Sequence, residues 1–164
     1  MPHFRSGSAT SLYEAFTSQT ILHGQELPEY LPELVLHVSE GCNLGCTYCF
    51  ADRGHYGEPQ ARWMTVSTAL GSIDAAIARY GHIGHIKFFG GEPLLNLDVI
   101  EAVCGHLDRR WCDQAIPERP GYGTVSNMTI CDNRTIELVR KHNLKLTGSI
   151  DGPMDIHDHF RSYT

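Results

Sequence analysis

The sequence predicts an α/β fold built on a parallel β-sheet, and three observations support this prediction. Short apolar segments alternate with longer segments of helical periodicity, in the order β-α-β-α-β-α-β. The first apolar segment, residues 34–38, has the pattern of a strand buried on both faces, which is typical of parallel sheets. The 164 residues are 41% hydrophobic and 20% charged, as expected for one globular domain. Right-handed crossovers would then give either an open doubly wound sheet or part of a (β/α) barrel.

The elements after residue 38 follow from apolar spacing and from capping residues. Residues 85–89, 123–126 and 145–150 are the next three predicted strands. Thr65 and Asn96 are expected to cap the first two helices, and Asp132 or Asn133 to begin the third. Gly81 ends the first helix. The apolar residues that define the three helices are, in order, Val66, Leu70, Ile73, Ile77 and Tyr80; Leu97, Ile100, Val103 and Leu107; Ile136 and Val139. After the fourth strand we expect a turn at residues 151–153 and a short terminal helix.

The chain divides into an N-terminal extension, residues 1–33, and a core, residues 34–164. Pro28 and Pro32 interrupt any long element in the extension, to which no function is assigned. The sequence contains no internal repeat, low-complexity tract or second domain.

Charge and hydropathy exclude two kinds of partner. The formal net charge is -6 and Lys and Arg form no run, so nucleic acid is not expected. No stretch approaches the roughly 20 apolar residues of a membrane helix, and the first ten residues lack the apolar segment of a secretory signal. We therefore expect a cytoplasmic protein without a membrane partner.

Three cysteines lie close together directly after the first predicted strand. Cys42, Cys46 and Cys49 have the spacing C-x3-C-x2-C, and Gly41 and Gly45 allow the backbone to wrap tightly around a metal centre. Structural zinc sites use four ligands and ordinary [4Fe-4S] carriers use four cysteines, so a local triad leaves one iron open for a ligand. The spacing alone also leaves open a zinc site completed by a nearby histidine such as His37 or His55.

The remaining cysteines and histidines carry weaker signals. A buried structural thiol is expected at Cys104, Cys112 and Cys131. Several scattered histidines lack the tight spacing of metal ligands, and surface or packing roles are expected for His82, His85, His157 and His159.

The cysteine spacing, with the aromatic Tyr48 just before Cys49, closely resembles the signature of the radical S-adenosylmethionine (SAM) superfamily. The resemblance covers residues 34–161 and is strongest for peptide and protein maturases. It implies a partial TIM barrel of the radical SAM type, and an enzyme with two cofactors, a [4Fe-4S] cluster and SAM. The cluster would be held by the three cysteines, its open iron would bind the amino and carboxylate groups of SAM, and reductive cleavage of SAM would give a 5'-deoxyadenosyl radical.

The segment after the second strand resembles the family's GGEP motif, which binds the SAM amino group. Gly90 and Gly91 would let the backbone approach a ligand closely, and the Glu92 carboxylate could accept hydrogen bonds from an ammonium. Pro93 completes the motif. Because such a carboxylate faces a ligand at a strand end, Glu92 is expected to contribute to SAM affinity rather than to folding.

Two further strand ends resemble SAM-contacting segments of this branch. Ser126 and Asn127 correspond to a Thr-Asn-Gly segment and are possible ribose contacts, although Met128 stands where Gly is usual. Ser149 and Arg161 lie in a stretch that resembles S-x-D-G-P…H-D-x-x-R, where serine and arginine contact the SAM carboxylate. All these segments follow predicted strands, and ligands of parallel α/β folds bind at the carboxyl ends of strands.

The resemblance implies a function in peptide or protein modification, such as thioether or other crosslink formation. The expected partners are a peptide or protein substrate and an electron donor such as flavodoxin or ferredoxin. Two alternatives stay open: a maturase that generates formylglycine in sulfatases, and a catalytically incomplete fragment that only binds a cluster. Four strands do not close a barrel, so we expect the chain to be truncated after its fourth strand.

Overall fold

The computed structural model describes residues 30–163 and contains four strands and the helices between and after them. The predicted order β-α-β-α-β-α-β is confirmed, and the terminal helix follows it. The elements are β1 (Leu31–Ser39), α2 (Val66–Tyr80), β2 (Ile83–Gly90), the 3-10 helix η1 (Pro93–Asn96), α3 (Leu97–Cys112), β3 (Gly121–Ser126), α4 (Asn133–His142), β4 (Lys145–Gly148) and α5 (Met154–Phe160). Strand β1 begins inside the expected extension, and the first 29 residues of that extension lie outside the described part of the chain.

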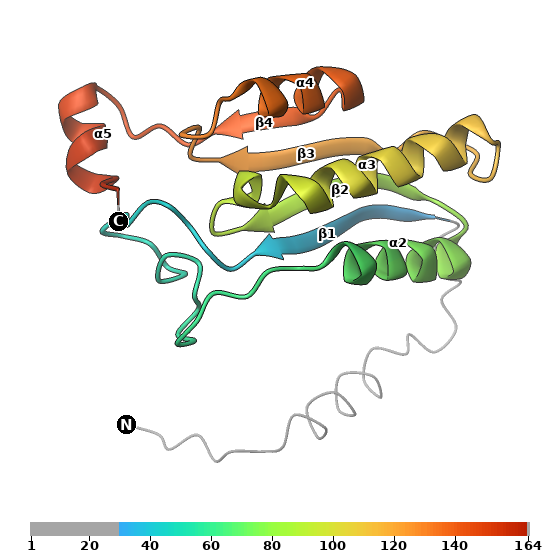
Figure 1. Ribbon diagram of the computed structural model, residues 1–164, viewed down its shortest axis with the longest axis horizontal. Helices are drawn as coiled ribbons and strands as arrows, with labels where there is room; N and C mark the ends of the chain where they lie inside the picture. Colours follow the sequence, from blue (N-terminus) through green and yellow to red (C-terminus); the bar gives the residue numbers. More distant parts are fainter. Residues whose placement is uncertain (1–29, 164) are drawn as a thin grey trace, which may run out of the picture.

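The four strands form one parallel sheet in the order β1-β2-β3-β4. Because each strand is added beside the previous one, right-handed crossovers place all connecting helices on the same face. Figure 1 shows α3 lying across that face between α2 and α4. This single-layer winding is that of a partial (β/α) barrel and excludes the doubly wound alternative.

The helix-covered face of the sheet carries the hydrophobic core. Ile86 and Phe88 of β2 are fully buried, as are Ile100 and Leu107 of α3. Burying each such side chain contributes about 1.5–3 kcal/mol. The alternate residues of the strands face the other way, and Val35 and Val125 are 49% and 39% exposed. The sheet therefore has one packed face and one open face.

Two of the three predicted helix caps form, and the third side chain has a different role. Thr65 accepts a hydrogen bond from the amide of Thr68 at 3.1 Å, and Asp132 accepts one from the amide of Thr135 at 2.8 Å. The Asn96 amide instead donates to the carbonyls of Val38 and Met64, at 2.8 and 3.0 Å. Asn96 thus ties the end of β1 to the segment before α2, because buried carbonyls there need a donor.

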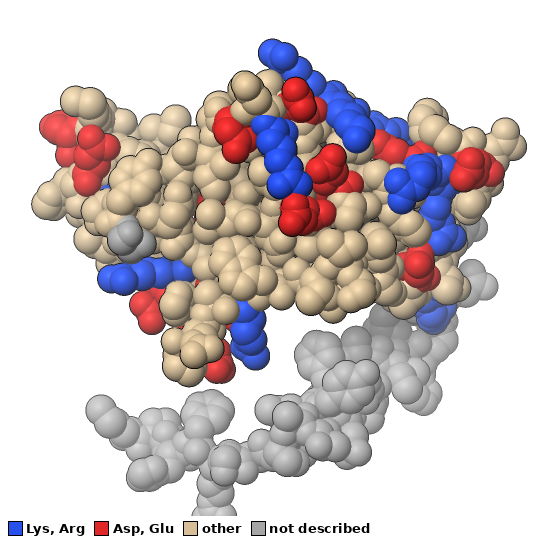
Figure 2. Space-filling model, in the orientation of Figure 1, with Lys and Arg blue, Asp and Glu red and all other residues tan. Residues whose placement is uncertain are grey.

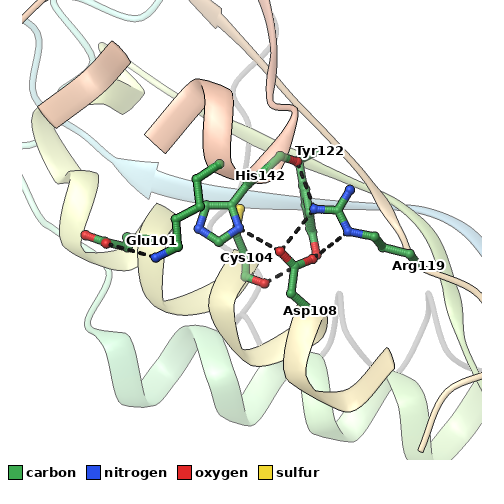
Figure 3. Close-up of polar contacts among 7 residues, drawn as sticks. Glu101, Cys104, Asp108, Arg119, Tyr122 and His142 are labelled. Atoms are coloured by element: carbon green, nitrogen blue, oxygen red, sulfur yellow. Dashed lines mark hydrogen bonds and ion pairs between the residues drawn. The ribbon is translucent and has the colours of Figure 1, made fainter. Parts of the chain in front are cut away.

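A polar cluster joins α3, β3 and α4 on the helix-covered face of the sheet (Figure 3). The Asp108 carboxylate accepts hydrogen bonds from Arg119, Tyr122 and the ring of His142, at distances between 2.7 and 3.0 Å. Burial opposes ionisation of Asp108, but the three donors outweigh it and hold the pKa of the carboxyl below its ordinary value. The cluster fixes the N-terminal end of β3 against two helices, at the opposite end of the sheet from the cysteine loop.

The outer surface of the helices is well supplied with charges of both signs. Figure 2 shows Lys, Arg, Asp and Glu interspersed over the face formed by α3 and α4. Arg134 lies 2.5 Å from Asp98 and 3.2 Å from Glu101, and Lys141 lies 3.8 Å from Glu101. Of the helices that the structure describes, none is long and apolar enough to cross a membrane.

Candidate SAM and cluster site

A cavity of about 220 Å³ lies at the carboxyl ends of the strands and is lined by the cysteine loop. Apart from Glu92 and Pro93, all the predicted site residues within residues 30–163 line it. These are Cys42, Cys46, Tyr48, Cys49, Gly90, Gly91, Ser126, Asn127, Ser149 and Arg161. The sheet brings them together because all four parallel strands end on the same side.

The sulfur of Cys42 receives two nitrogen donors. The backbone amide of Leu44 lies 3.4 Å from it, and Nδ2 of Asn127 lies 3.7 Å from it. Burial raises the pKa of the Cys42 thiol, and these donors favour its thiolate form. Hydrogen bonds to cysteine sulfur are characteristic of iron–sulfur sites, so the surroundings of Cys42 fit a cluster ligand.

The zinc alternative finds no set of ligands already gathered around one point in the described part of the chain. Among residues 30–163, no three His, Cys, Asp or Glu side chains are gathered closely enough to hold a single metal ion. His37, one of the histidines proposed for zinc, instead contacts the hydroxyl of Tyr56 at 3.3 Å. Three thiols spread around a cavity suit a cluster, which binds each ligand through a different iron.

Gly90 and Gly91 allow the end of β2 to lie in backbone contact with the end of β1 and the start of the cysteine loop. At Gly90, where φ is +149°, a Cβ atom would lie 2.0 Å from the Ser39 carbonyl oxygen. At Gly91 it would lie 2.5 Å from the Gly41 carbonyl oxygen and 3.1 Å from Cβ of Cys42. Contacts this short exclude any side chain, so both glycines are required for the cysteine loop to lie against β2.

Glu92 lies behind the cavity wall and does not line the cavity, contrary to the expectation of a ligand-facing carboxylate at a strand end. The residue is only 1% exposed. Its two oxygens accept hydrogen bonds from the backbone amides of Leu94, at 3.1 Å, and Asn127, at 2.8 Å. Burial outweighs these donors and raises the pKa of the carboxyl. Pro93 is likewise buried, at the start of η1. Both residues support the wall from behind.

Asn127 is the centre of a polar network that links β3 to the cysteine loop. Its Nδ2 also donates to Oδ1 of Asn43 at 2.9 Å, and its Oδ1 accepts from the amide and the hydroxyl of Thr129. Nδ2 of Asn43 closes the ring by donating to the Thr129 hydroxyl at 2.7 Å. Met128 adopts φ +62°, so the backbone keeps the left-handed conformation that glycine would favour. Asn43 and Thr129 were not predicted, because their pairing is visible only in three dimensions.

Arg161 is held by an aspartate that the sequence did not mark as a site residue. Its Nε and Nη2 both donate to Asp151 at 2.9 Å, and its guanidinium carbon lies 5.5 Å from the centre of the Tyr48 ring. The Tyr48 hydroxyl donates to the same carboxylate. The Arg161 guanidinium, followed by the Tyr48 hydroxyl, holds the pKa of Asp151 below its ordinary value. We call Tyr48, Asp151 and Arg161 the carboxylate clamp. Asp151 stood in the quoted S-x-D-G-P stretch, but nothing in that stretch indicates its partners.

The segment after α5 binds the cysteine loop through its backbone. The amide of Gly45 donates to the Ser162 carbonyl at 2.7 Å, and the amide of Thr47 donates to the Phe160 carbonyl at 3.0 Å. Leu44 and Tyr163 form an antiparallel bridge beside them. The strand β4 ends at Gly148, two residues earlier than predicted, and this allows the chain to turn toward the loop. The segment therefore fixes both the loop and the clamp.

The other cysteines and histidines lie away from the cavity lining that the structure describes. Cys104 is fully buried as expected, but Cys112 and Cys131 are exposed, so the prediction of buried thiols is wrong for those two. The ring of His85 packs over β3, and His82 stacks on Tyr30. His157 accepts a long hydrogen bond, 3.4 Å, from the amide of Asp151.

Sequence comparison places these features in a known family. The profile described as "Radical SAM superfamily" matches residues 36–164. The chain is 31% identical over 133 residues to the uncharacterized protein MJ0907 of Methanocaldococcus jannaschii, covering 81% of this chain and 43% of that protein. It is 28% identical to a GTP 3',8-cyclase of Rhodococcus opacus, covering 73% of this chain and 32% of that protein. It is 29% identical to the radical SAM cyclopropyl synthase TigE of Paramaledivibacter caminithermalis, covering 80% of this chain and 29% of that protein.

A solved structure has the same architecture. Native anSMEcpe with bound AdoMet, an anaerobic sulfatase maturase, matches with a TM-score of 0.64 and 27% identity, covering 81% of this chain and 35% of that one. The same protein has also been solved with AdoMet and a Cp18Cys peptide, with a TM-score of 0.65. The chain spans less than half the length of each of these relatives. Family members use a [4Fe-4S] cluster and SAM, and the cavity brings together the three cysteines that would hold the cluster. On the strength of the profile match, the chain belongs to the radical SAM superfamily.

Proposed function

We propose that this chain is the cofactor-binding part of a radical SAM enzyme that modifies a peptide or protein substrate, by a thioether or other crosslink. The observation that carries the proposal is the cavity in which three thiols, a glycine pair, Asn127 and Arg161 meet at the strand ends. The likeness to anSMEcpe, which has been solved with a Cp18Cys peptide, supports a peptide substrate. The chain is also similar to GTP 3',8-cyclases, which share the cofactor-binding part. An electron donor such as flavodoxin or ferredoxin and a location in the cytoplasm belong to the same proposal.

Each wall of the cavity has a role in this proposal. Cys42, Cys46 and Cys49 would hold three irons of the cluster and leave the fourth open. The amide of Leu44 and the side chain of Asn127 favour the charged form of Cys42. When bound, the cluster and SAM supply one-electron cleavage of a carbon–sulfur bond and removal of hydrogen from the substrate. The protein binds and orients both cofactors and excludes water.

The residues facing SAM divide according to the group they would contact. Arg161 and Ser149 line the side of the cavity proposed for the SAM carboxylate, and within residues 30–163 the hydrogen bonds of Arg161 use Nε and Nη2 but not Nη1. Ser126 and Asn127 lie where the ribose is proposed, with Tyr48 beside the clamp. Gly90 and Gly91 present bare backbone to the ligand. Glu92 would act from behind that backbone, by its charge and by fixing the amide of Asn127.

Anaerobic reconstitution tests the proposal. The chain should take up about four irons and four sulfides, and on reduction with SAM it should release 5'-deoxyadenosine. The triple variant Cys42→Ala, Cys46→Ala, Cys49→Ala should lose the iron. A matched double variant of the two exposed cysteines, Cys112→Ala with Cys131→Ala, should keep it. Zinc in anaerobically isolated protein with no iron uptake would overturn the cluster assignment, and a cluster without SAM cleavage would favour a binding domain.

The formylglycine maturase is the second candidate, because one of the solved structures that match the chain is a sulfatase maturase. The two candidates differ in product. A crosslinked peptide keeps its cysteine sulfur, whereas conversion of cysteine to formylglycine removes it. Mass spectrometry of a cysteine-containing peptide after turnover distinguishes them.

A further inference from the structure

The open face of the sheet carries basic side chains directly below the cysteine cavity. Lys87 on β2 and Lys145 on β4 are both in register with Gly123 on β3. Both lysines line a depression of about 270 Å³ on this face. Neighbouring strands lie about 4.8 Å apart, so the two lysines stand about 10 Å apart with a bare glycine between them.

His85 fills the space above that glycine strand. A Cβ atom on Gly121 would lie 2.6 Å from Nδ1 of His85, and one on Gly123 would lie 2.9 Å from its Nε2. The imidazole therefore lies flat across β3, with one nitrogen over the residue that separates the two lysines. We call His85, Lys87 and Lys145 the basic row.

The basic row lacks the acidic partners that Arg62, Arg110, Arg119, Arg134, Lys141 and Arg161 have. Within residues 30–163, no Asp or Glu oxygen lies within 4.0 Å of a nitrogen of any of its three members. The depression includes one carboxylate, Glu33, against the two ammonium groups of Lys87 and Lys145. On the helix face, by contrast, Arg110 and Lys141 pair with acids. An excess of unpaired positive charge in a hollow attracts an anionic ligand.

The depression adjoins the proposed reaction site. Val125 lines both the depression and the cysteine cavity, so a single extended ligand can reach from one to the other. We propose that the basic row binds acidic side chains of the peptide substrate and thereby positions the neighbouring residue at the cavity. This inference rests on the proposed peptide-modifying function and names the substrate class, an acidic peptide, for the same site. The carboxylates would accept hydrogen bonds from Lys87 and Lys145, with His85 between them.

Fluorescence anisotropy on the reconstituted chain tests whether the basic row binds an acidic peptide. The probe is a fluorescein-labelled peptide, Gly-Asp-Gly-Asp-Cys-Gly, and its control replaces both aspartates with asparagine. Removing two cationic contacts by Lys87→Gln with Lys145→Gln should weaken binding of the acidic peptide about tenfold. It should leave the asparagine peptide unchanged. The matched control, Arg140→Gln with Lys141→Gln, removes the same charge from α4 and should leave both affinities unchanged.

The alternatives give different results. Equal binding of the two peptides, or equal weakening in both double variants, would overturn the basic row as a peptide site. GTP that binds more tightly than the acidic peptide, and loses affinity with Lys87 and Lys145, would show that the row serves a nucleotide. Release of 5'-deoxyadenosine in the same samples reports separately on the proposed function. If SAM is cleaved while the peptides bind equally, the inference fails and the cofactor assignment stands.

Discussion

Glu92 joins the ends of β2 and β3 by accepting hydrogen bonds from the backbone amides of Leu94 and Asn127. A carboxylate buried in this way satisfies donors that would otherwise be left unpaired behind the cavity wall. The residue therefore acts on the site through the backbone. Its proposed influence on SAM cannot be separated from its contribution to the fold by activity alone.

Glu92→Gln should destabilise the protein. The side-chain amide of glutamine has one oxygen for two backbone donors, so one buried amide loses its acceptor. We expect the free energy of unfolding to fall by about 1–3 kcal/mol, measured by urea denaturation with circular dichroism. Glu101→Gln is the control: this half-exposed carboxylate on α3 makes only surface ion pairs, and its loss should change stability little. Unchanged stability of Glu92→Gln would show that the carboxylate is dispensable to the fold.

The carboxylate clamp connects elements that are far apart in the sequence. Asp151 follows β4, Arg161 follows α5, and Tyr48 lies in the cysteine loop. Because one carboxylate fixes both an arginine and a tyrosine at the cavity, Asp151 acts as a positioning residue for whatever Arg161 contacts.

Asp151→Asn keeps the shape of the side chain and removes its charge. Arg161 and Tyr48 should then lose their common anchor, and binding of SAM to the reconstituted chain should weaken about tenfold, because the ligand must order them itself. Equilibrium dialysis with SAM measures this, and iron content should stay the same. Asp155→Asn, on the exposed surface of α5, is the matched control. Loss of iron in parallel with SAM affinity would instead make Asp151 a structural support of the loop.

Local patterns predicted the elements well, whereas contacts between elements remained hidden. The helices α2, α3 and α4 followed from apolar spacing and the strands from short apolar segments, since these depend on neighbouring residues. Asn96 was expected to cap a helix and instead bridges two carbonyls, because tertiary donors and acceptors compete with local capping. The contact of Asp151 with Tyr48, the pairing of Asn43 and the buried setting of Glu92 depend on segments more than 30 residues away. Such pairings leave no periodic trace in the sequence.

At the scale of the whole molecule, the Asp108 cluster links α3, β3 and α4 into one unit (Figure 3). Because the folded protein lowers the pKa of Asp108, the unfolded chain binds this proton more readily. The resulting stabilisation is fully present above the unfolded-state pKa of about 4. It is lost as the pH falls through the lower, folded-state value.

Asp108→Asn should therefore lower the free energy of unfolding at pH 7. It should also make that free energy depend less on pH in the acid range. We expect a loss of about 1–3 kcal/mol at pH 7, because Arg119 and His142 lose their charged acceptor. As the pH falls from about 4 through the lower folded-state pKa of Asp108, the variant and the wild type should converge. Denaturation at a series of pH values measures both effects, with the exposed Asp98→Asn as the control. A constant difference between Asp108→Asn and wild type across the whole acid range would contradict the assignment.

The backbone bonds between the cysteine loop and residues 160–163 also set an order of events during synthesis on the ribosome. The thiols emerge more than a hundred residues before the segment that holds their loop in place. Until Phe160 and Ser162 have left the exit tunnel, the loop lacks the partners for Gly45 and Thr47. A nascent chain therefore exposes its three loop cysteines before the loop has its final conformation. Iron delivered after translation would find the loop already shaped, whereas iron delivered earlier would meet an open one.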